Sequence, residues 1–154
     1  MAGRIEKRLA ELGLELPVAA APVANYVPFV QSGAMVYVSG QISQGPGGPI
    51  RGRLGEDMAA EAGAAAARSC ALSLLAQLRA ACGGDLDRLK RVVKLTGFVA
   101  SAPGFTDQPK VVNGASDLMV ELLGDTGRHA RSAVGVAALP LGAAVEIEAI
   151  FEVA

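Results

Sequence analysis

The sequence has few of the residues that most often carry nucleophilic catalysis or metal binding. Its 154 residues include no tryptophan, one histidine (His129) and two cysteines (Cys70 and Cys82). A Ser-His-Asp triad is not supported, because no orienting carboxylate can be identified for His129, which lies between two arginines. A zinc site is not supported either, since one histidine and two distant cysteines do not form the usual ligand cluster. We therefore expect no metal.

The two cysteines are also expected not to form a disulfide with each other. The sequence predicts that Cys70 and Cys82 lie in one helix, where their separation of 12 residues corresponds to about 18 Å along the axis. That distance is too long for a disulfide bond. We expect both thiols to be reduced and structural, which fits a cytoplasmic protein.

The sequence also lacks an excess of charge of either sign. It has 14 Lys and Arg against 15 Asp and Glu, a net charge of −1, so it offers no general attraction to phosphate backbones or anionic lipids. A nucleic-acid binder is therefore disfavoured. The first 17 residues mix charges with apolar residues, unlike an export signal, and no uncharged apolar run reaches the roughly 20 residues that span a bilayer. We expect a cytoplasmic protein without a membrane segment.

Small and aliphatic side chains, by contrast, are abundant. Hydrophobic residues make up 51% of the chain and aromatic residues only 4%. A chain of this length buries roughly two-thirds of its unfolded surface around a single core. We predict one domain over residues 1–154, in which residues 1–20 form an additional N-terminal helix and linker.

Hydrophobic periodicity predicts strands and helices in alternation. Residues 28–42, 91–101, 132–140 and 143–154 are predicted strands, residues 56–82 and 103–124 are predicted helices, and residues 43–55 are a Gly/Pro-rich connector. Gly83 and Gly84 end the first helix, and Thr106 is a candidate cap of the second. On the second helix, Asn113 points away from the apolar stripe formed by Val111, Ala115, Leu118 and Leu122.

This order of elements predicts an α+β fold, with a β-sheet and two main helices packed on one of its faces. The other face then needs cover. Alternating Val, Ile and Ala positions on the last two strands suggest that another subunit supplies it. Taken alone, Glu146, Glu148 and Glu152 on one side of the last strand are most simply a solvated face.

Several stretches of the sequence, in order, resemble the RidA/YjgF family, also called the reactive-intermediate deaminases. They are "SGQI" at residues 39–42, "VVKLTGFV" at 92–99, "VN" at 112–113, and "ARSAVGVAALP" followed by "VEIEAI" between 130 and 150. The resemblance extends from about Tyr26 to the end of the chain. It implies a chorismate-mutase-like single domain with a mixed sheet, assembly as a homotrimer, ligand sites in clefts between subunits, and no cofactor.

The resemblance also implies roles for individual residues. Arg131 matches the arginine that holds a substrate carboxylate with two hydrogen bonds, a task suited to a planar guanidinium. Glu146 matches the glutamate that positions or activates water, so these two residues are the catalytic candidates. Tyr26, Ser39 and Asn113 match residues that line the substrate pocket. A surface arginine, a turn serine and a packing tyrosine remain the simpler interpretations of Arg131, Ser39 and Tyr26.

This chain departs from the family pattern at several points. Ala133 stands where deaminating members commonly have a cysteine, and residues 114–116 read Gly-Ala-Ser where those members often have an aromatic residue. These differences indicate a divergent member with an altered pocket. In a simple hairpin of the last two strands, moreover, Arg131 would be opposite Ile150 rather than Glu146.

The resemblance favours one activity and leaves two alternatives. The first is hydrolysis of reactive 2-imino or enamine acids to 2-oxo acids and ammonia, catalysed by a hydrolase that acts on C=N bonds. The second is a non-catalytic trimer that binds small carboxylate metabolites, which the altered pocket favours. The third is endoribonuclease activity, a label attached to relatives described as L-PSP-like. The acidic balance and single histidine do not support the third.

Overall fold

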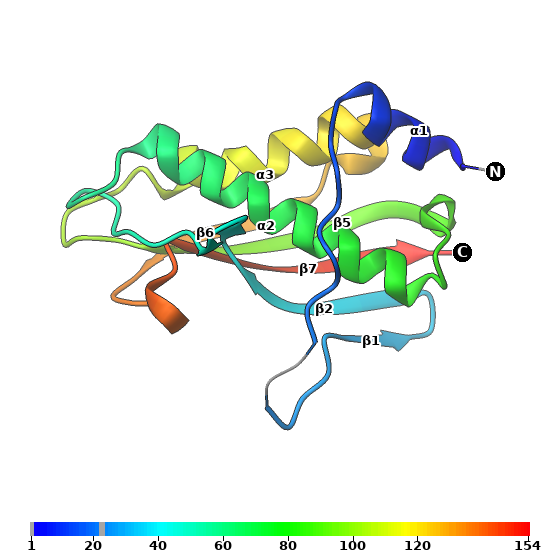
Figure 1. The fold of residues 1–154 in the computed structure, drawn as a ribbon, viewed down its shortest axis with the longest axis horizontal. Helices are drawn as coiled ribbons and strands as arrows, with labels where there is room; N and C mark the ends of the chain where they lie inside the picture. The colour runs from blue at the N-terminus through cyan, green and yellow to red at the C-terminus, as the bar shows by residue number, and fades with distance from the viewer. Residues whose placement is uncertain (1, 22–23) are drawn as a thin grey trace.

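Two long helices cover one face of a mixed, five-stranded β-sheet (Figure 1). The structure is a computed structural model that describes residues 2–21 and 24–154. The elements are α1 (Arg4–Glu11), β1 (Phe29–Ser32), β2 (Met35–Ile42), β3 (Gln44–Gly45), β4 (Gly48–Pro49), α2 (Ala60–Ala81), β5 (Leu89–Ala100), α3 (Gln108–Leu123), β6 (Ala130–Val136) and β7 (Val145–Val153), with 3₁₀ turns at Leu86–Arg88, Gly124–Gly127 and Pro140–Gly142. No helix in the described ranges is long and apolar enough to cross a membrane. The predicted α+β fold is confirmed.

The strands follow the order β1-β2-β7-β5-β6 across the sheet. β7 lies in the middle, antiparallel to β2 and β5, while β6 pairs with β5 in parallel at the edge. The last two strands do not pair as a simple hairpin, because β5 lies between them. Arg131 is opposite Leu95 of β5, not Ile150. β5 pairs along both of its edges, with β7 over residues 89–99 and with β6 over residues 94–100.

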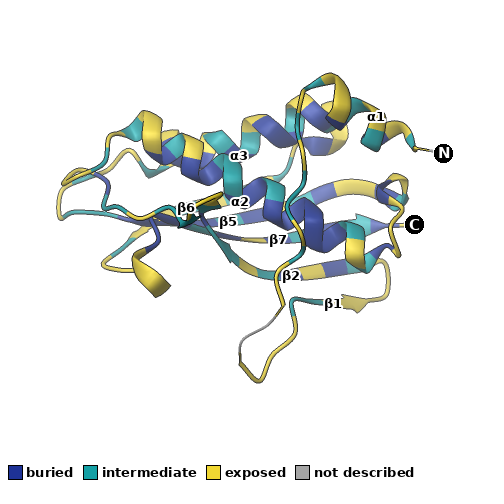
Figure 2. Ribbon diagram, viewed as in Figure 1, coloured by how far each residue is buried: buried dark blue, intermediate teal, exposed yellow. Residues whose placement is uncertain are grey.

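The core lies between the sheet and the helices (Figure 2). The predicted stripe of α3 is confirmed, since all of its residues are buried. On β7, alternate residues from Val145 to Val153 are buried, and the residues between them face the other way. The expectation that the Val, Ile and Ala positions of the last strand lie on the uncovered face is therefore wrong for all of them except Ile150. The others face the helices, and the uncovered side of β7 carries three glutamates and Ile150.

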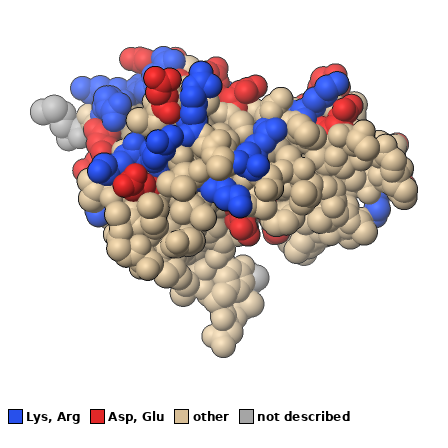
Figure 3. Space-filling model, turned by 180° about the vertical axis from the view of Figure 1, so that it is seen from behind, with Lys and Arg blue, Asp and Glu red and all other residues tan. Residues whose placement is uncertain are grey.

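The uncovered face nevertheless has apolar residues on the neighbouring strands. Val30, Tyr37 and Ile150 are opposite one another across β1, β2 and β7. Val30 is 52% exposed and Tyr37 is 47% exposed. Phe98 and Val134 form a second apolar pair across β5 and β6. Figure 3, which shows the molecule from behind, has its charged side chains gathered along the upper part and a mostly uncharged lower part.

Some element boundaries differ from the predicted ones for local reasons. α2 begins four residues after the predicted start at Glu56, because the carboxylate of Asp57 accepts a backbone N–H in the preceding turn. Thr106 does not cap α3, which begins at Gln108 and has no side-chain cap. The predicted first strand is divided by a turn at Gly33, whose φ of 60° suits glycine. The Gly/Pro-rich connector contains the small β3-β4 hairpin.

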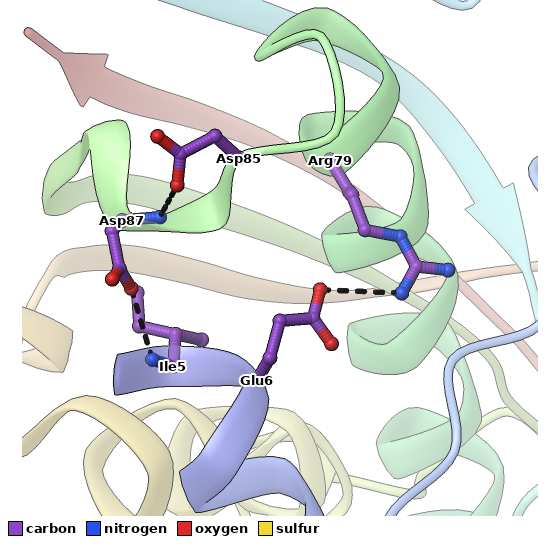
Figure 4. A network of polar contacts seen from close by, with 5 residues as sticks. All are labelled: Ile5, Glu6, Arg79, Asp85 and Asp87. Carbon is purple, nitrogen blue, oxygen red and sulfur yellow. Dashed lines mark hydrogen bonds and ion pairs between the residues drawn. The ribbon is translucent and has the colours of Figure 1, made fainter. Parts of the chain in front are cut away.

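Polar contacts fix α1 to the last turn of α2 and to the 3₁₀ turn that follows it (Figure 4). The carboxylate of Asp87 accepts hydrogen bonds from the backbone N–H groups of Arg4 (2.7 Å) and Ile5 (2.9 Å). Glu6 forms an ion pair of 3.4 Å with Arg79. Because the first N–H groups of a helix have no partner within it, Asp87 serves α1 as an N-cap supplied from a distant part of the chain.

Residues 13–21, which we call the N-terminal arm, lead from α1 across α2 toward the lower edge of the sheet (Figure 1). The arm is held by Gln77 of α2, whose amide donates a hydrogen bond of 2.9 Å to the carbonyl of Ala20. Gln77 is only 2% exposed. A buried amide without a partner would be costly, so this bond favours one path of the arm over α2.

Candidate functional site

Four polar side chains meet at the β6 edge of the sheet, and we call them the arginine cluster: Asn113, Ser116, His129 and Arg131. The Nη1 atom of Arg131 donates hydrogen bonds to the Oδ1 of Asn113 (2.8 Å) and the Oγ of Ser116 (3.2 Å). Asn113 and Ser116 are three residues apart on α3 and therefore share one face of the helix. The structure thus brings together the predicted residues Arg131 and Asn113 and adds two others.

His129 is hydrogen-bonded through both ring nitrogens. Its Nδ1 lies 2.7 Å from the carbonyl oxygen of Gly127, and its Nε2 lies 2.9 Å from the Oγ of Ser116. A carbonyl can only accept, so Nδ1 carries the hydrogen and Nε2 of the neutral ring accepts from the Ser116 hydroxyl. Burial, and to a lesser extent the charge of Arg131, lowers the pKa of His129 against the opposing effect of the Gly127 bond. The neutral ring is therefore favoured near pH 7.

The arginine cluster borders a shallow hollow of about 290 Å³, also lined by Asp117, Val120 and Arg128. Within the described residues, no hydrogen bond engages the Nε or Nη2 atoms of Arg131. These two atoms form one edge of the guanidinium, and such an edge matches the two oxygens of a carboxylate. The cluster can therefore bind a small anionic ligand.

A second hollow, which we call the glutamate pocket, lies beside β2 and the central strand β7. It has a volume of about 490 Å³, and its lining includes Ala20, Ala21, Tyr26, Gly40, Leu141 and Glu146. The end of the N-terminal arm thus forms part of the wall. The structure brings together the predicted residues Tyr26 and Glu146 in this pocket, with the phenol ring half exposed.

An irregularity in β2 shapes the glutamate pocket. Ser39 and Gly40 together are opposite the single residue Glu148 of β7, which makes a β-bulge. A Cβ atom on Gly40 would lie only 3.0 Å from the Cδ of Glu146. Gly40 therefore leaves the space that the Glu146 carboxylate occupies.

Ser39 does not line the glutamate pocket but holds the chain beside it. Its hydroxyl donates a hydrogen bond of 2.8 Å to the carbonyl of Val27, and its N–H donates one of 2.8 Å to the carbonyl of Pro28. These bonds fix the segment that follows Tyr26. Ser39 itself borders a separate shallow hollow together with Tyr37.

The surroundings of Glu146 raise the pKa of its carboxyl group. Glu146 is opposite Ile42 on one side and Phe98 on the other, so apolar side chains flank it. Burial is the main cause of the raised pKa, and the nearby charge of Glu148 adds to it. A carboxylate with a raised pKa is a better proton acceptor when ionised, as general-base catalysis requires.

The arginine cluster and the glutamate pocket face opposite sides of the sheet. Arg131 pairs with buried Leu95 and reaches toward α3, whereas Glu146 projects from β7 to the uncovered face. The sheet therefore separates these two side chains within one chain. The predicted residues divide into Asn113 and Arg131 on one side, and Tyr26, Glu146 and the neighbouring Ser39 on the other.

Sequence reasoning missed Ser116 and His129, although a signal was present. Ser116 follows Asn113 by three residues on a predicted helix, and His129 precedes Arg131 by two residues directly before the strand predicted at residues 132–140. The first spacing places two side chains on one side of a helix, and the second does so where the chain is extended. His129 was set aside because no carboxylate could orient it, but the carbonyl of Gly127 does so instead.

Among residues 2–21 and 24–154, no three His, Cys, Asp or Glu side chains are placed to hold a metal ion. The side chains of the two groups are a guanidinium, a carboxylate, a phenol, an amide and the Ser116–His129 pair.

Known proteins resemble the chain over nearly its whole length. It is 54% identical over 152 residues to Protein TCP17 of Trypanosoma cruzi. This alignment covers 97% of this chain and 94% of that protein. A crystal structure of a protein of unknown function from Agrobacterium tumefaciens is 51% identical and superposes with a TM-score of 0.91, over 98% of this chain and 93% of that one. RidA from an Antarctic Psychrobacter is 31% identical, with a TM-score of 0.60 over 88% of this chain and 94% of that one.

These similarities have one explanation in common. The whole chain follows the Agrobacterium structure closely, while RidA is similar at lower identity and with a looser superposition. Residues 6–152 match the family described as "YjgF/chorismate mutase-like, putative endoribonuclease". The chain therefore belongs to the YjgF/RidA family.

Proposed function

We propose that this protein is a homotrimer that hydrolyses reactive 2-imino and enamine acids to 2-oxo acids and ammonia in clefts between its subunits. The observation that carries the proposal is the separation of Arg131 from Glu146 by the sheet. Each group is open toward solvent, yet one chain does not bring them together. A cleft that combines the arginine cluster of one copy with the glutamate pocket of the next supplies a carboxylate grip and a base.

The uncovered face of the sheet supports assembly. Val30, Tyr37 and Val134 are each close to half exposed, and together with Ile150 they would be removed from water by another copy. Burying such side chains is favourable by roughly 25 cal/mol per Å² of apolar surface. The resemblance of the sequence to trimeric relatives sets the number of copies in this proposal.

In the proposed reaction, Arg131 holds the substrate carboxylate through Nε and Nη2, which places the adjacent C=N carbon at a fixed distance from the cleft wall. Glu146 accepts a proton from water as the water oxygen bonds to that carbon and the C=N π bond breaks, and the carboxylic acid of Glu146 then passes this proton to the nitrogen, which gives the carbinolamine. Glu146 next accepts the hydroxyl proton of the carbinolamine as the C=O bond forms and the C–N bond breaks, and the leaving nitrogen takes that proton and departs as ammonia. An enamine enters the same sequence after tautomerising to the imine. The sum consumes one water for each ammonia released.

Modest catalytic power is sufficient for this reaction, because simple imines already hydrolyse in water. Orientation of the carboxylate and a positioned base therefore account for the acceleration. The raised pKa of Glu146 supports its role as that base. The 2-oxo acid product keeps the carboxylate, so pyruvate and 2-oxobutanoate are expected to bind Arg131 as the substrate does.

The test measures the decay of freshly generated 2-iminobutanoate or 2-iminopropanoate with and without the protein. The proposal expects faster decay with wild type and none above background with Arg131→Ala. Binding of pyruvate without any acceleration of imine decay would instead establish the non-catalytic carboxylate binder. Endoribonuclease activity, named in the family description, has weaker support, because the net charge of −1 provides no general attraction to RNA.

A further inference from the structure

Ser116 and His129 have no counterpart among the family residues that the sequence resemblance transfers. The resemblance assigns roles to Asn113 and Arg131, and at residues 114–116 the chain departs from the pattern of deaminating members. In the structure, this departure places a serine hydroxyl against Arg131 and the ring of His129 against that hydroxyl. The altered stretch at residues 114–116 therefore contributes hydrogen bonds through Ser116, and its smaller side chains do more than enlarge the pocket.

The hydrogen bonds of these residues form one directed chain. The carbonyl of Gly127 accepts from Nδ1 of His129, which leaves Nε2 as an acceptor. The hydroxyl of Ser116 donates to Nε2, which leaves its lone pairs to accept from Nη1 of Arg131. Each bond thus determines the direction of the next, from the backbone of the 3₁₀ turn to the guanidinium.

The turn at the start of this chain is itself held firmly. Gly127 is buried, and a Cβ atom at this position would overlap the backbone carbonyl of Met119 on α3. The turn therefore packs directly against the helix that carries Ser116. This close packing fixes the Gly127 carbonyl relative to Ser116, so His129 is held at both ends.

The consequence for Arg131 is geometric. Nη1 has two hydrogens, and the oxygens of Asn113 and Ser116 accept them. A guanidinium is planar, so fixing Nη1 at two points fixes the orientation of the opposite edge, Nε and Nη2. That edge is the one left for a ligand.

We infer that Ser116 and His129 are positioning residues: they act as a hydrogen-bond relay that orients Arg131 so that its Nε–Nη2 edge binds the carboxylate of a 2-imino or 2-oxo acid. The inference rests on the proposed function for the role of Arg131. The burial of His129 and its lowered pKa agree with a neutral acceptor ring at this position. Neither Ser116 nor His129 needs to touch the ligand.

The first test reads the tautomer of His129 directly. Because His129 is the one histidine in the sequence, ¹⁵N-detected NMR of protein without a histidine tag gives a single imidazole. The relay requires the Nδ1–H tautomer, the less common form of free histidine, at a pH where the ring is neutral. Ser116→Ala should shift the Nε2 resonance, and Ser32→Ala, an exposed site on the opposite edge strand, should not. An Nε2–H tautomer, or an Nε2 resonance that Ser116→Ala leaves unchanged, would overturn the relay.

The second test measures pyruvate binding by calorimetry. Ser116→Ala should weaken binding about three- to tenfold, the effect of one lost hydrogen bond, and should not weaken the helix, since alanine is the better helix former. Ser116→Thr keeps the hydroxyl and should recover most of the affinity. His129→Gln retains an acceptor near Nε2 and should bind better than His129→Ala.

The variants also separate this inference from the proposed function. If Arg131→Ala binds pyruvate as wild type does, the proposed function fails. If Arg131→Ala abolishes binding while Ser116→Ala binds as tightly as wild type, only the relay fails. Ser116→Ala and His129→Ala should raise the KM for imine hydrolysis and leave kcat nearly unchanged. That result is expected if the two residues orient the ligand through Arg131 and take no part in the chemical step. Equal loss of affinity in Ser116→Ala and Ser116→Thr would contradict the relay, since the hydroxyl would not be the group that matters.

Discussion

Mixing two inactive variants tests whether one active site combines residues from two subunits. In Arg131→Ala, every cleft keeps Glu146 but lacks the guanidinium, and in Glu146→Gln every cleft keeps Arg131 but lacks the carboxylate. If each cleft takes Arg131 from one copy and Glu146 from its neighbour, random assembly of equal amounts gives both native residues in about one quarter of the clefts. If both residues act within one chain, no mixed trimer contains an intact site.

The assay requires that the two variants exchange subunits. Refolding them together, with intact-mass measurement of the mixed trimers, fulfils that requirement, and imine decay is then compared with each variant refolded alone. A matched control mixes wild type with the double variant Arg131→Ala/Glu146→Gln. Shared clefts predict about one quarter of wild-type activity in that control, whereas a site within one chain predicts about one half. Verified mixed trimers with no activity above the separate variants would refute the shared cleft.

Three further predictions concern single positions. Arg131→Lys should bind pyruvate more weakly than wild type by roughly 1–3 kcal/mol in calorimetry, because lysine has the charge but not the planar fork, and wild-type affinity would contradict the two-point grip. Glu146→Gln should lower kcat far more than pyruvate affinity, yet raise the melting temperature at pH 7. The pKa of Glu146 is raised in the folded state, so ionisation of its carboxyl group destabilises the fold as the pH rises through that pKa. The increase in melting temperature from glutamine should therefore become smaller as the pH falls toward the unfolded pKa of about 4.3. An equal increase at pH 4 and pH 7 would argue against this cause. Replacing Cys70 and Cys82 by alanine should leave pyruvate binding unchanged, and buried Cys70, whose pKa is raised by burial, should resist maleimide in native protein; a folded double variant that loses binding would place a thiol in the site.

The sequence was sufficient for the elements that a repeating pattern defines. The stripe of α3 from Val111 to Leu122 has one apolar side at helical spacing, and it is buried as predicted. The alternation in β7 correctly separates Glu146 from its buried neighbours. What the pattern could not decide was which side of each strand the helices cover. Alternation defines two faces but does not say which one is inside.

Strand order limited the prediction of the candidate site more than any single residue did. Neighbours along the chain are not always neighbours in a sheet, and here β5 lies between β6 and β7. That insertion pairs Arg131 with Leu95 and puts its side chain on the helix side. The contacts of Ser116 and His129 depend on the same arrangement, since they need α3 and β6 to lie together. The sequence pattern of α3 or of β6 taken alone does not show that these two elements lie together.

The N-terminal arm and β7 contribute different parts of the glutamate pocket, the arm part of its wall and β7 its carboxylate. The carboxylate stands on β7 in the middle of the sheet, while Ala20 and Ala21 of the wall belong to a peripheral segment that Gln77 ties to α2. Replacing either alanine by a larger residue narrows the opening without touching the strand that carries Glu146. In the proposed function, the N-terminal arm therefore limits the size of the ligand and β7 supplies the proton acceptor, so these two properties can diverge independently among relatives.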